Sequence, residues 1–188
     1  MAFAFNAALA LVGLGFDPLT DFRVRDNGDG TTSISEWHSQ QPQPTPEQIG
    51  AAMLPAAQAQ VIPRIKAERE RRQQSDGFPV TLPGLGTVRF HSDPHSRSQH
   101  AGLFALANSL LLQGGNTSTP IGSPQVQWRT LGGQAVPLTV GVVLALMQAA
   151  LLREASVHAA ADAHIAAVQA LTDAEAVLAY DHSTGWPE

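Results

Sequence analysis

The feature that most constrains the fold of this chain is an alternation, from Ile65 onward, of short strand-like segments with long alanine-rich segments. In the alanine-rich segments, apolar residues recur at intervals of three and four, which is the spacing of a buried helix face. The longer stripe comprises Val143, Leu146, Met147, Ala150, Val157, Ala161, Ile165 and Val168. We therefore expect a helix-rich α+β fold in which short β-hairpins pack on alanine-rich helices.

Capping signals set the expected ends of these helices. Asp93 precedes a proline and predicts a helix start, because its carboxylate can accept hydrogen bonds from free backbone N–H groups. Gly114 predicts the end of that helix. Thr139 predicts the start of the long helix, and Thr172-Asp-Ala-Glu175 forms a capping box that opens a short last helix ending near Tyr180. The small residues of the long helix allow close packing, either on the helix that begins at Asp93 or on copies of the chain. We favour packing within the chain, because the apolar repeat is not the sustained heptad of a coiled coil.

Two stretches predict β-hairpins, at residues 21–37 and 126–138, and residues 80–90, with their prolines and glycines, predict at best a short, interrupted pair of strands. In the first, polarity alternates around Asn27-Gly-Asp-Gly30, whose glycines supply the positive φ angles of a tight turn. The same residues partly match a calcium-binding loop. The first position of that loop is Arg25, a cation where calcium needs a carboxylate, so we favour the hairpin turn.

Prolines organise the first half of the chain. Residues 40–44 predict an extended linker, which divides an N-terminal segment (residues 1–44) from a helical α+β domain (residues 45–188). Thr45 begins a helix with a capping box. Pro55 and Pro63 are expected to break or kink that helix, leaving a separate charged helix from near Pro63 to Gln74. A solvated face explains the alternating charges of this helix more simply than a charged recognition surface does.

The composition excludes several classes of function. Charged residues make up 14% of the 188 positions, against about 25% in a typical soluble protein, so much of the surface is uncharged or covered by partner chains. The net charge is −5, and the basic cluster from Arg64 to Arg72 is interleaved with glutamates, which disfavours nucleic-acid binding. The chain has no cysteine, which removes disulfides, thiolate catalysis and Cys-ligated zinc.

The N-terminal run from Met1 to Phe16 is apolar. It lacks a preceding Lys or Arg, and at about 15 residues it is too short to span a bilayer, so we expect no membrane insertion. We interpret it as a docking segment, because an exposed apolar terminus needs a core or a partner to cover it. The candidate residues for contact with another subunit are Phe3, Phe5, Leu9 and Leu11.

One cluster suggests metal or catalytic chemistry. His91, Asp93, His95 and His100 combine ligand types that bind zinc or iron. However, a capping role occupies Asp93, and His95 and His100 are five residues apart, so they do not share a helix face. The sequence also contains no nucleophile elbow and no phosphate-binding loop after a strand. We therefore expect no catalytic residues, no metal and no cofactor.

The C-terminal stretch of about 125 residues resembles a known family. The matching pieces are "IKAERERR" from Ile65, "GF" at Gly77, "RFHSD" ending at Asp93, "W-R-T" followed by "V-P-L-T", and the terminal "D-x-x-T-G-W-P". In this order and spacing they resemble a domain of unknown function found in tailed-phage and prophage proteins, beside or fused to tail fibres. The resemblance implies a phage context and supplies no catalytic residues.

Three functions remain open at this point. The first is a structural tail protein that attaches or organises a fibre, spike or distal-tail component. Such a protein is assembled in the host cytoplasm and ends up in the virion tail, where we expect it to form a homo-oligomer and to contact other tail proteins. The second is a tail-fibre assembly chaperone absent from the mature virion. The third is a hydrolase of host surface polymers, which would need paired carboxylates in a cleft. The low charge favours the first.

Overall fold

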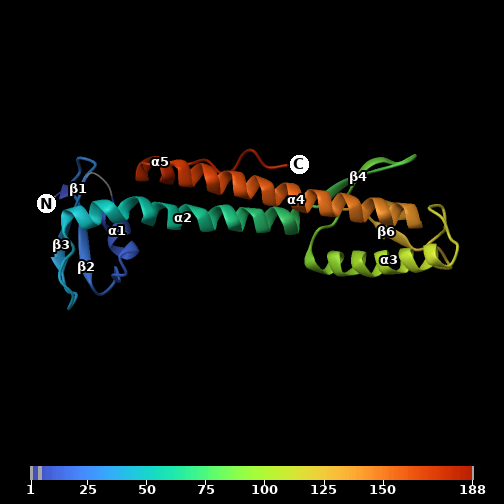
Figure 1. Cartoon of the computed structure of the whole chain (residues 1–188), viewed down its shortest axis with the longest axis horizontal. Helices are drawn as coiled ribbons and strands as arrows, with labels where there is room; N and C mark the ends of the chain where they lie inside the picture. The colour runs from blue at the N-terminus through green and yellow to red at the C-terminus, as the bar shows by residue number, and fades with distance from the viewer. Residues whose placement is uncertain (1, 4–5, 188) are drawn as a thin grey trace. The chain divides into compact units, whose positions relative to one another are not determined.

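The structure is a computed structural model that describes residues 2–3 and 6–187. Its helices are α1 (Ala7–Gly13), α2 (Pro46–Ser75), α3 (Pro94–Leu112), α4 (Val140–Ala170) and α5 (Ala174–Leu178) (Figure 1). Its strands are β1 (Ala2–Phe3), β2 (Phe22–Asp26), β3 (Thr32–Trp37), β4 (Phe78–Leu82), β5 (Gly86–Phe90), β6 (Gln127–Arg129) and β7 (Ala135–Pro137). Helices make up half of the described residues and short antiparallel strand pairs 16% of them, which confirms the predicted helix-rich α+β fold.

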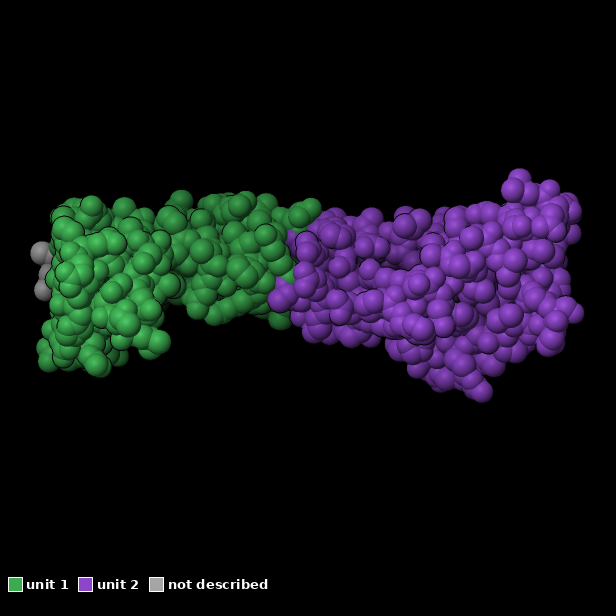
Figure 2. All heavy atoms as spheres, turned by 90° about the horizontal axis from the view of Figure 1, so that it is seen from below, with its two compact units in different colours: residues 1–66, 162–184 green, residues 67–161, 185–188 purple. Residues whose placement is uncertain are grey.

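The chain divides into two compact units, shown in different colours in Figure 2. Unit 1 comprises residues 1–66 and 162–184, and unit 2 comprises residues 67–161 and 185–188. Helices α2 and α4 each contribute residues to both units. The units therefore divide the chain at other positions than the sequence-based boundary after residue 44.

Unit 1 is built on an antiparallel sheet with strand order β1-β3-β2. The predicted hairpin is confirmed, with Gly28 and Gly30 at φ angles of 80° and 81° in its turn. Asp29 accepts hydrogen bonds from the backbone and hydroxyl of Thr31 at 2.9 and 2.5 Å, and Asp26 accepts one from the Gly28 amide at 2.8 Å. The oxygens that a calcium loop would use thus stabilise the turn itself.

The sheet, α1 and the start of α2 enclose an apolar core in unit 1. Its buried residues are Ala7, Ala10, Leu11, Phe16, Phe22 and Ile49. The Phe16 ring also meets Trp37 edge-on, with centroids 4.8 Å apart. Burial of one large apolar side chain contributes about 1.5–3 kcal/mol, so this small core accounts for the position of α1 against the hairpin.

Helix α2 corrects one sequence-based prediction. The capping box at its start is confirmed, because the Thr45 amide donates to Gln48 at 2.8 Å and the Gln48 amide to Thr45 Oγ1 at 3.3 Å. The expected break at Pro55 and Pro63 is wrong, since one helix runs through both. Both prolines lie at exposed positions, as do Ala51 and Ala59, the residues four places before them. Their carbonyls lose a helical partner but face solvent, where water can replace it.

Unit 2 packs two hairpins and α3 on the first half of α4. One buried cluster joins the β4–β5 hairpin to Val136 and Leu146, and another joins Ala107 of α3 to Val140 and Val143 of α4. The predicted caps are confirmed: Asp93 accepts from the Ser96 amide at 3.0 Å and Thr139 from the Val142 amide at 3.3 Å. These contacts bear out the expectation that the two alanine-rich helices pack together within the chain.

Two further observations concern the C-terminal helices. Helix α5 is capped by Asp173, which accepts from the Ala176 amide at 2.8 Å, rather than by Thr172, and it ends at Leu178.

Helix α4 has the length and apolar content of a bilayer-spanning helix. Core helices of soluble proteins meet the same criteria, and α4 includes Arg153 and Glu154 at mid-length. The absence of membrane insertion stays a prediction.

Candidate functional site

The candidate site is a cavity of about 140 Å³ in unit 2. It lies where the end of α2, the β4–β5 hairpin, the start of α3 and the middle of α4 meet. Its polar lining residues are Arg72, Gln73, Ser92, Arg97, His100, Arg153 and Glu154. Its apolar lining residues are Phe78, Met147, Ala150, Leu151 and Val157. We call this cavity the arginine pocket.

A glycine turn brings α2 to the pocket. Gly77 has a φ of +64°, and a Cβ added there would lie 2.4 Å from the Phe90 carbonyl oxygen. Its amide donates to Ser92 Oγ at 3.1 Å, a buried hydrogen bond. Only glycine fits both the left-handed backbone and the close approach, which explains why "GF" occurs between the charged helix and the hairpin.

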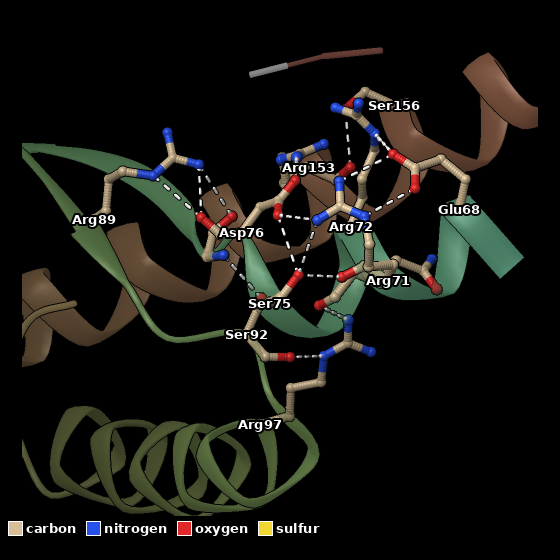
Figure 3. Close-up of polar contacts among 12 residues, drawn as sticks. Glu68, Arg71, Arg72, Ser75, Asp76, Arg89, Ser92, Arg97, Arg153 and Ser156 are labelled. Carbon is tan, nitrogen blue, oxygen red and sulfur yellow. Dashed lines mark hydrogen bonds and ion pairs between the residues drawn. The ribbon is translucent and has the colours of Figure 1, made fainter. Parts of the chain in front are cut away.

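Two arginines tie the end of α2 to the rest of the unit (Figure 3). Arg97 donates from Nε to the Ser92 carbonyl at 2.7 Å and from Nη2 to the Gln73 carbonyl at 2.8 Å. Arg89 donates from Nε and Nη2 to the Asp76 carbonyl at 3.2 and 2.8 Å. Carbonyls at a helix C-terminus lack helical partners and have partial negative charge, so cations are favoured there.

The charged part of α2 forms a network around Glu68. Glu68 accepts from Arg71 at 2.8 and 2.9 Å and from Arg72 at 2.6 Å. The hydrogen bonds from Arg71 are the main cause that lowers the pKa of Glu68 to about 2. The side chains of Glu68 and Arg72 are only 20% and 19% exposed. The predicted solvated face is therefore wrong for these two residues, which lie largely inside the fold.

Arg153 is the exceptional cation of the pocket. Its side chain is 9% exposed, and its Nε and Nη1 atoms are buried without any hydrogen-bond acceptor. The nearest carboxylate is Asp76, 3.9 Å from Nη2, which is beyond hydrogen-bonding distance (Figure 3). Burial lowers the pKa of Arg153, and Asp76 opposes that shift. The guanidinium stays charged, because an ordinary arginine titrates far above neutral pH.

His100 lies at another wall of the pocket. It is 2% exposed, contacts the rings of Phe78 and Trp128, and its Nε2 has no partner. Burial lowers its pKa to about 4, so the imidazole is neutral at pH 7. Of the predicted cluster, the structure places only His100 in this pocket: Asp93 caps α3, and His95 is exposed in its first turn. Among residues 2–3 and 6–187, no three His, Asp or Glu side chains lie close enough to hold a metal.

The N-terminal contact candidates fall in different environments. Leu11 is fully buried in the core of unit 1, so a contact through it would require α1 to move. Leu9 is half-buried on α1. Phe3 belongs to β1, whose backbone pairs with β3, while Phe5 lies outside the described residues. Their role in binding another subunit stays a prediction.

Two residues that define the arginine pocket, Arg153 and Gln73, were not among the residues predicted from the sequence. Arg153 lies three residues after Ala150 and four before Val157, so it occupies a position of the apolar stripe on α4. An arginine at a stripe position is a signal for a buried cation. Gln73 gave no comparable signal, because its burial follows from how α2 ends. With guanidinium, amide and imidazole groups, the pocket can hold an anion.

Two parts of the chain match known protein families. Residues 15–62 match the XkdW protein family, a phage-associated family, which links the chain to phage proteins as its motifs implied. No curated protein and no solved structure matches the chain. Residues 56–182, well over half of the chain, match the domain of unknown function DUF4376, and the chain therefore belongs to that family.

Proposed function

We propose that this protein is a structural component of a phage or prophage tail, which attaches or organises a fibre, spike or distal-tail component and is not an enzyme. The observation that supports this role is the surface of α4. From Val140 to Leu152 the helix has no charged residue on any face, yet Leu151 and Leu152 are 63% and 64% exposed. Gln148 is the one exposed polar side chain of this stretch, and a helix with so little polar surface belongs where most of its sides are covered.

A protein partner suits this surface better than a lipid bilayer does. Val143 and Leu146, on the same stretch of α4, are buried by α3 and the hairpins, so one side of the helix is already occupied by protein. Exposed apolar side chains such as Leu151 and Leu152 on an otherwise uncharged stretch of helix are typical of subunit contacts, whether with copies of this chain or with other tail proteins.

The first experiment is quantitative mass spectrometry of purified particles from the phage or induced prophage that encodes the chain. A stoichiometric amount in intact particles is the expected result. Absence from particles, together with recovery alongside the fibre protein from infected-cell lysate, would contradict the structural role and favour an assembly chaperone.

A pair of variants tests whether the exposed apolar surface of α4 makes the contact. The double change Leu151→Gln and Leu152→Gln should lower incorporation into particles about tenfold, a loss of roughly 1.4 kcal/mol in binding. Leu19→Gln is the matched control, because Leu19 is 89% exposed in unit 1 and outside this surface. Equal incorporation of both variants would contradict the proposed contact.

A further inference from the structure

We propose that the arginine pocket binds a carboxylate on a short apolar stem, with Arg153 as its counter-charge. The ligand is a monocarboxylic acid group, supplied either by an acidic side chain or chain end of another protein or by a free small organic acid. The proposal concerns unit 2 alone and does not depend on the tail role.

The first argument is that Arg153 lacks an acceptor. A buried cation without hydrogen-bonding partners is strongly unfavourable, and the structure leaves two of its nitrogens in that state. Asp76 does not satisfy them, because its carboxylate lies 3.9 Å from the third nitrogen and is itself bound by Arg71 at 3.1 Å. The pocket adjoining Arg153 is where an external acceptor can enter.

The second argument is the charge balance of the pocket. Arg72 is paired with Glu68 at 2.6 Å, and Arg97 donates to two carbonyls and lies 3.7 Å from Glu154. Among the residues that line the pocket, these two cations are therefore occupied, which leaves the positive charge of Arg153. One unmatched charge suits a monoanion such as a carboxylate, whereas a phosphate dianion would bring one negative charge in excess.

The third argument is the shape and chemistry of the walls. Gln73 Nε2 and His100 Nε2 are buried without hydrogen-bond partners, so two more polar atoms can form hydrogen bonds with a ligand. The remaining lining is apolar, with Phe78, Met147 and Val157 around a cavity of about 140 Å³. A few polar groups in an otherwise apolar pocket are typical of ligand sites, and this size admits only a short stem.

The test uses the full chain and two probes, sodium butanoate and its neutral isostere butanamide. Titration followed by ¹H–¹⁵N NMR should give saturable shifts at the Gly77 and Ser92 amides with butanoate, with a Kd of about 1 mM or tighter. Butanamide should give none. Equal shifts with both probes, or none with butanoate, would overturn the proposal.

Variants assign the interaction to Arg153. Arg153→Met should abolish the butanoate shifts, Arg153→Lys should retain part of the affinity, and Arg64→Met, at an exposed position of unit 1, should change nothing. If Arg153→Met does not fold, the Arg153→Lys variant and the butanamide titration still test whether a positive charge at position 153 binds the carboxylate. Unchanged binding in a folded Arg153→Met variant would refute the role of Arg153.

A third probe distinguishes the two sources of the carboxylate. The blocked peptide acetyl-Ala-Glu-Ala-amide presents a glutamate side chain as a partner protein would. Tighter binding of the peptide than of butanoate indicates a protein partner, and binding of butanoate alone indicates a free acid. Binding of inorganic phosphate in preference to both would contradict the charge argument.

Discussion

The two units differ in what their cores contain. In unit 1 the buried core residues, such as Leu11, Phe22 and Ile49, are apolar. Among the described residues, the nearly fully buried polar ones are Ser92, Ser96, His100 and Thr130, and all four lie in unit 2. Burying polar groups is unfavourable unless each finds a partner. The core of unit 1 is thus apolar, whereas in unit 2 the side chains of Gln73, His100 and Arg153, each with a buried polar atom that lacks a hydrogen bond, line one cavity, as is typical of a binding site.

The largest expected effect contrasts one glycine from each unit. Gly77→Ala should lower the free energy of unfolding by about 3 kcal/mol, because the left-handed backbone and a collision with the Phe90 carbonyl add together. Gly28→Ala has the same sign of φ but no atom within 4 Å of the new Cβ, so only about 1 kcal/mol is expected. Urea denaturation followed by circular dichroism measures both. Equal losses would contradict the close approach at Gly77.

The second prediction concerns the pH dependence of stability that arises from His100. Its pKa is about 4 in the folded protein and 6.5 in the unfolded chain, so the unfolded state binds more protons between these values. Stability should therefore be complete above pH 6.5 and fall by about 2–3 kcal/mol as the pH drops to 4. Burial is the main cause of this shift; Asp93 opposes it and His91 adds to it.

Denaturation midpoints measured from pH 7.5 to pH 4 check this prediction. His100→Phe should flatten the dependence in that window, because the ring is retained without a titrating group. His95→Gln, at an exposed position of α3, should leave the slope as it is. A steep slope that persisted in the His100 variant would assign the effect to other groups.

The smallest effect compares two arginines within unit 2. Arg153→Met should raise the free energy of unfolding by about 1 kcal/mol, because it removes a buried cation that lacks acceptors. Arg97→Met should lower it by about 2 kcal/mol, since two carbonyls lose their donor. Thermal unfolding by calorimetry separates the two signs. A destabilised Arg153 variant would show that this residue serves the fold rather than a ligand.

Local signals in the sequence predicted much of the fold. Caps at Thr45, Asp93 and Thr139 and the hairpin turn at Gly28 were predicted correctly, because each depends on residues within a few positions of one another. The helix break predicted at the prolines of α2 was wrong, because the effect of a proline depends on which face of the helix is exposed to solvent. That face is set by contacts with distant residues, which the local pattern does not contain.

The candidate site was harder to predict than the fold. His100 stood out as part of a histidine cluster, but its true neighbours are Phe78 and Trp128, which are distant in sequence. Arg153 was visible only as an interruption of an apolar stripe. Whether such an arginine finds an acceptor depends on the ends of α2 and β5, and no short-range rule places them next to the middle of α4.

The discontinuity of unit 1 has a consequence for synthesis on the ribosome. Residues 1–66 emerge first, but the other part of their unit, residues 162–184, emerges only after nearly all of unit 2. The hydrogen bond from Gln58 to the Val168 carbonyl, at 3.4 Å, thus joins residues that are 110 positions apart in the order of synthesis. Until then the nascent chain must hold Val61 and Ile65 of α2, both buried in the finished protein, without their final surroundings. A chain released near residue 161 would contain nearly all of unit 2 but only the first part of unit 1.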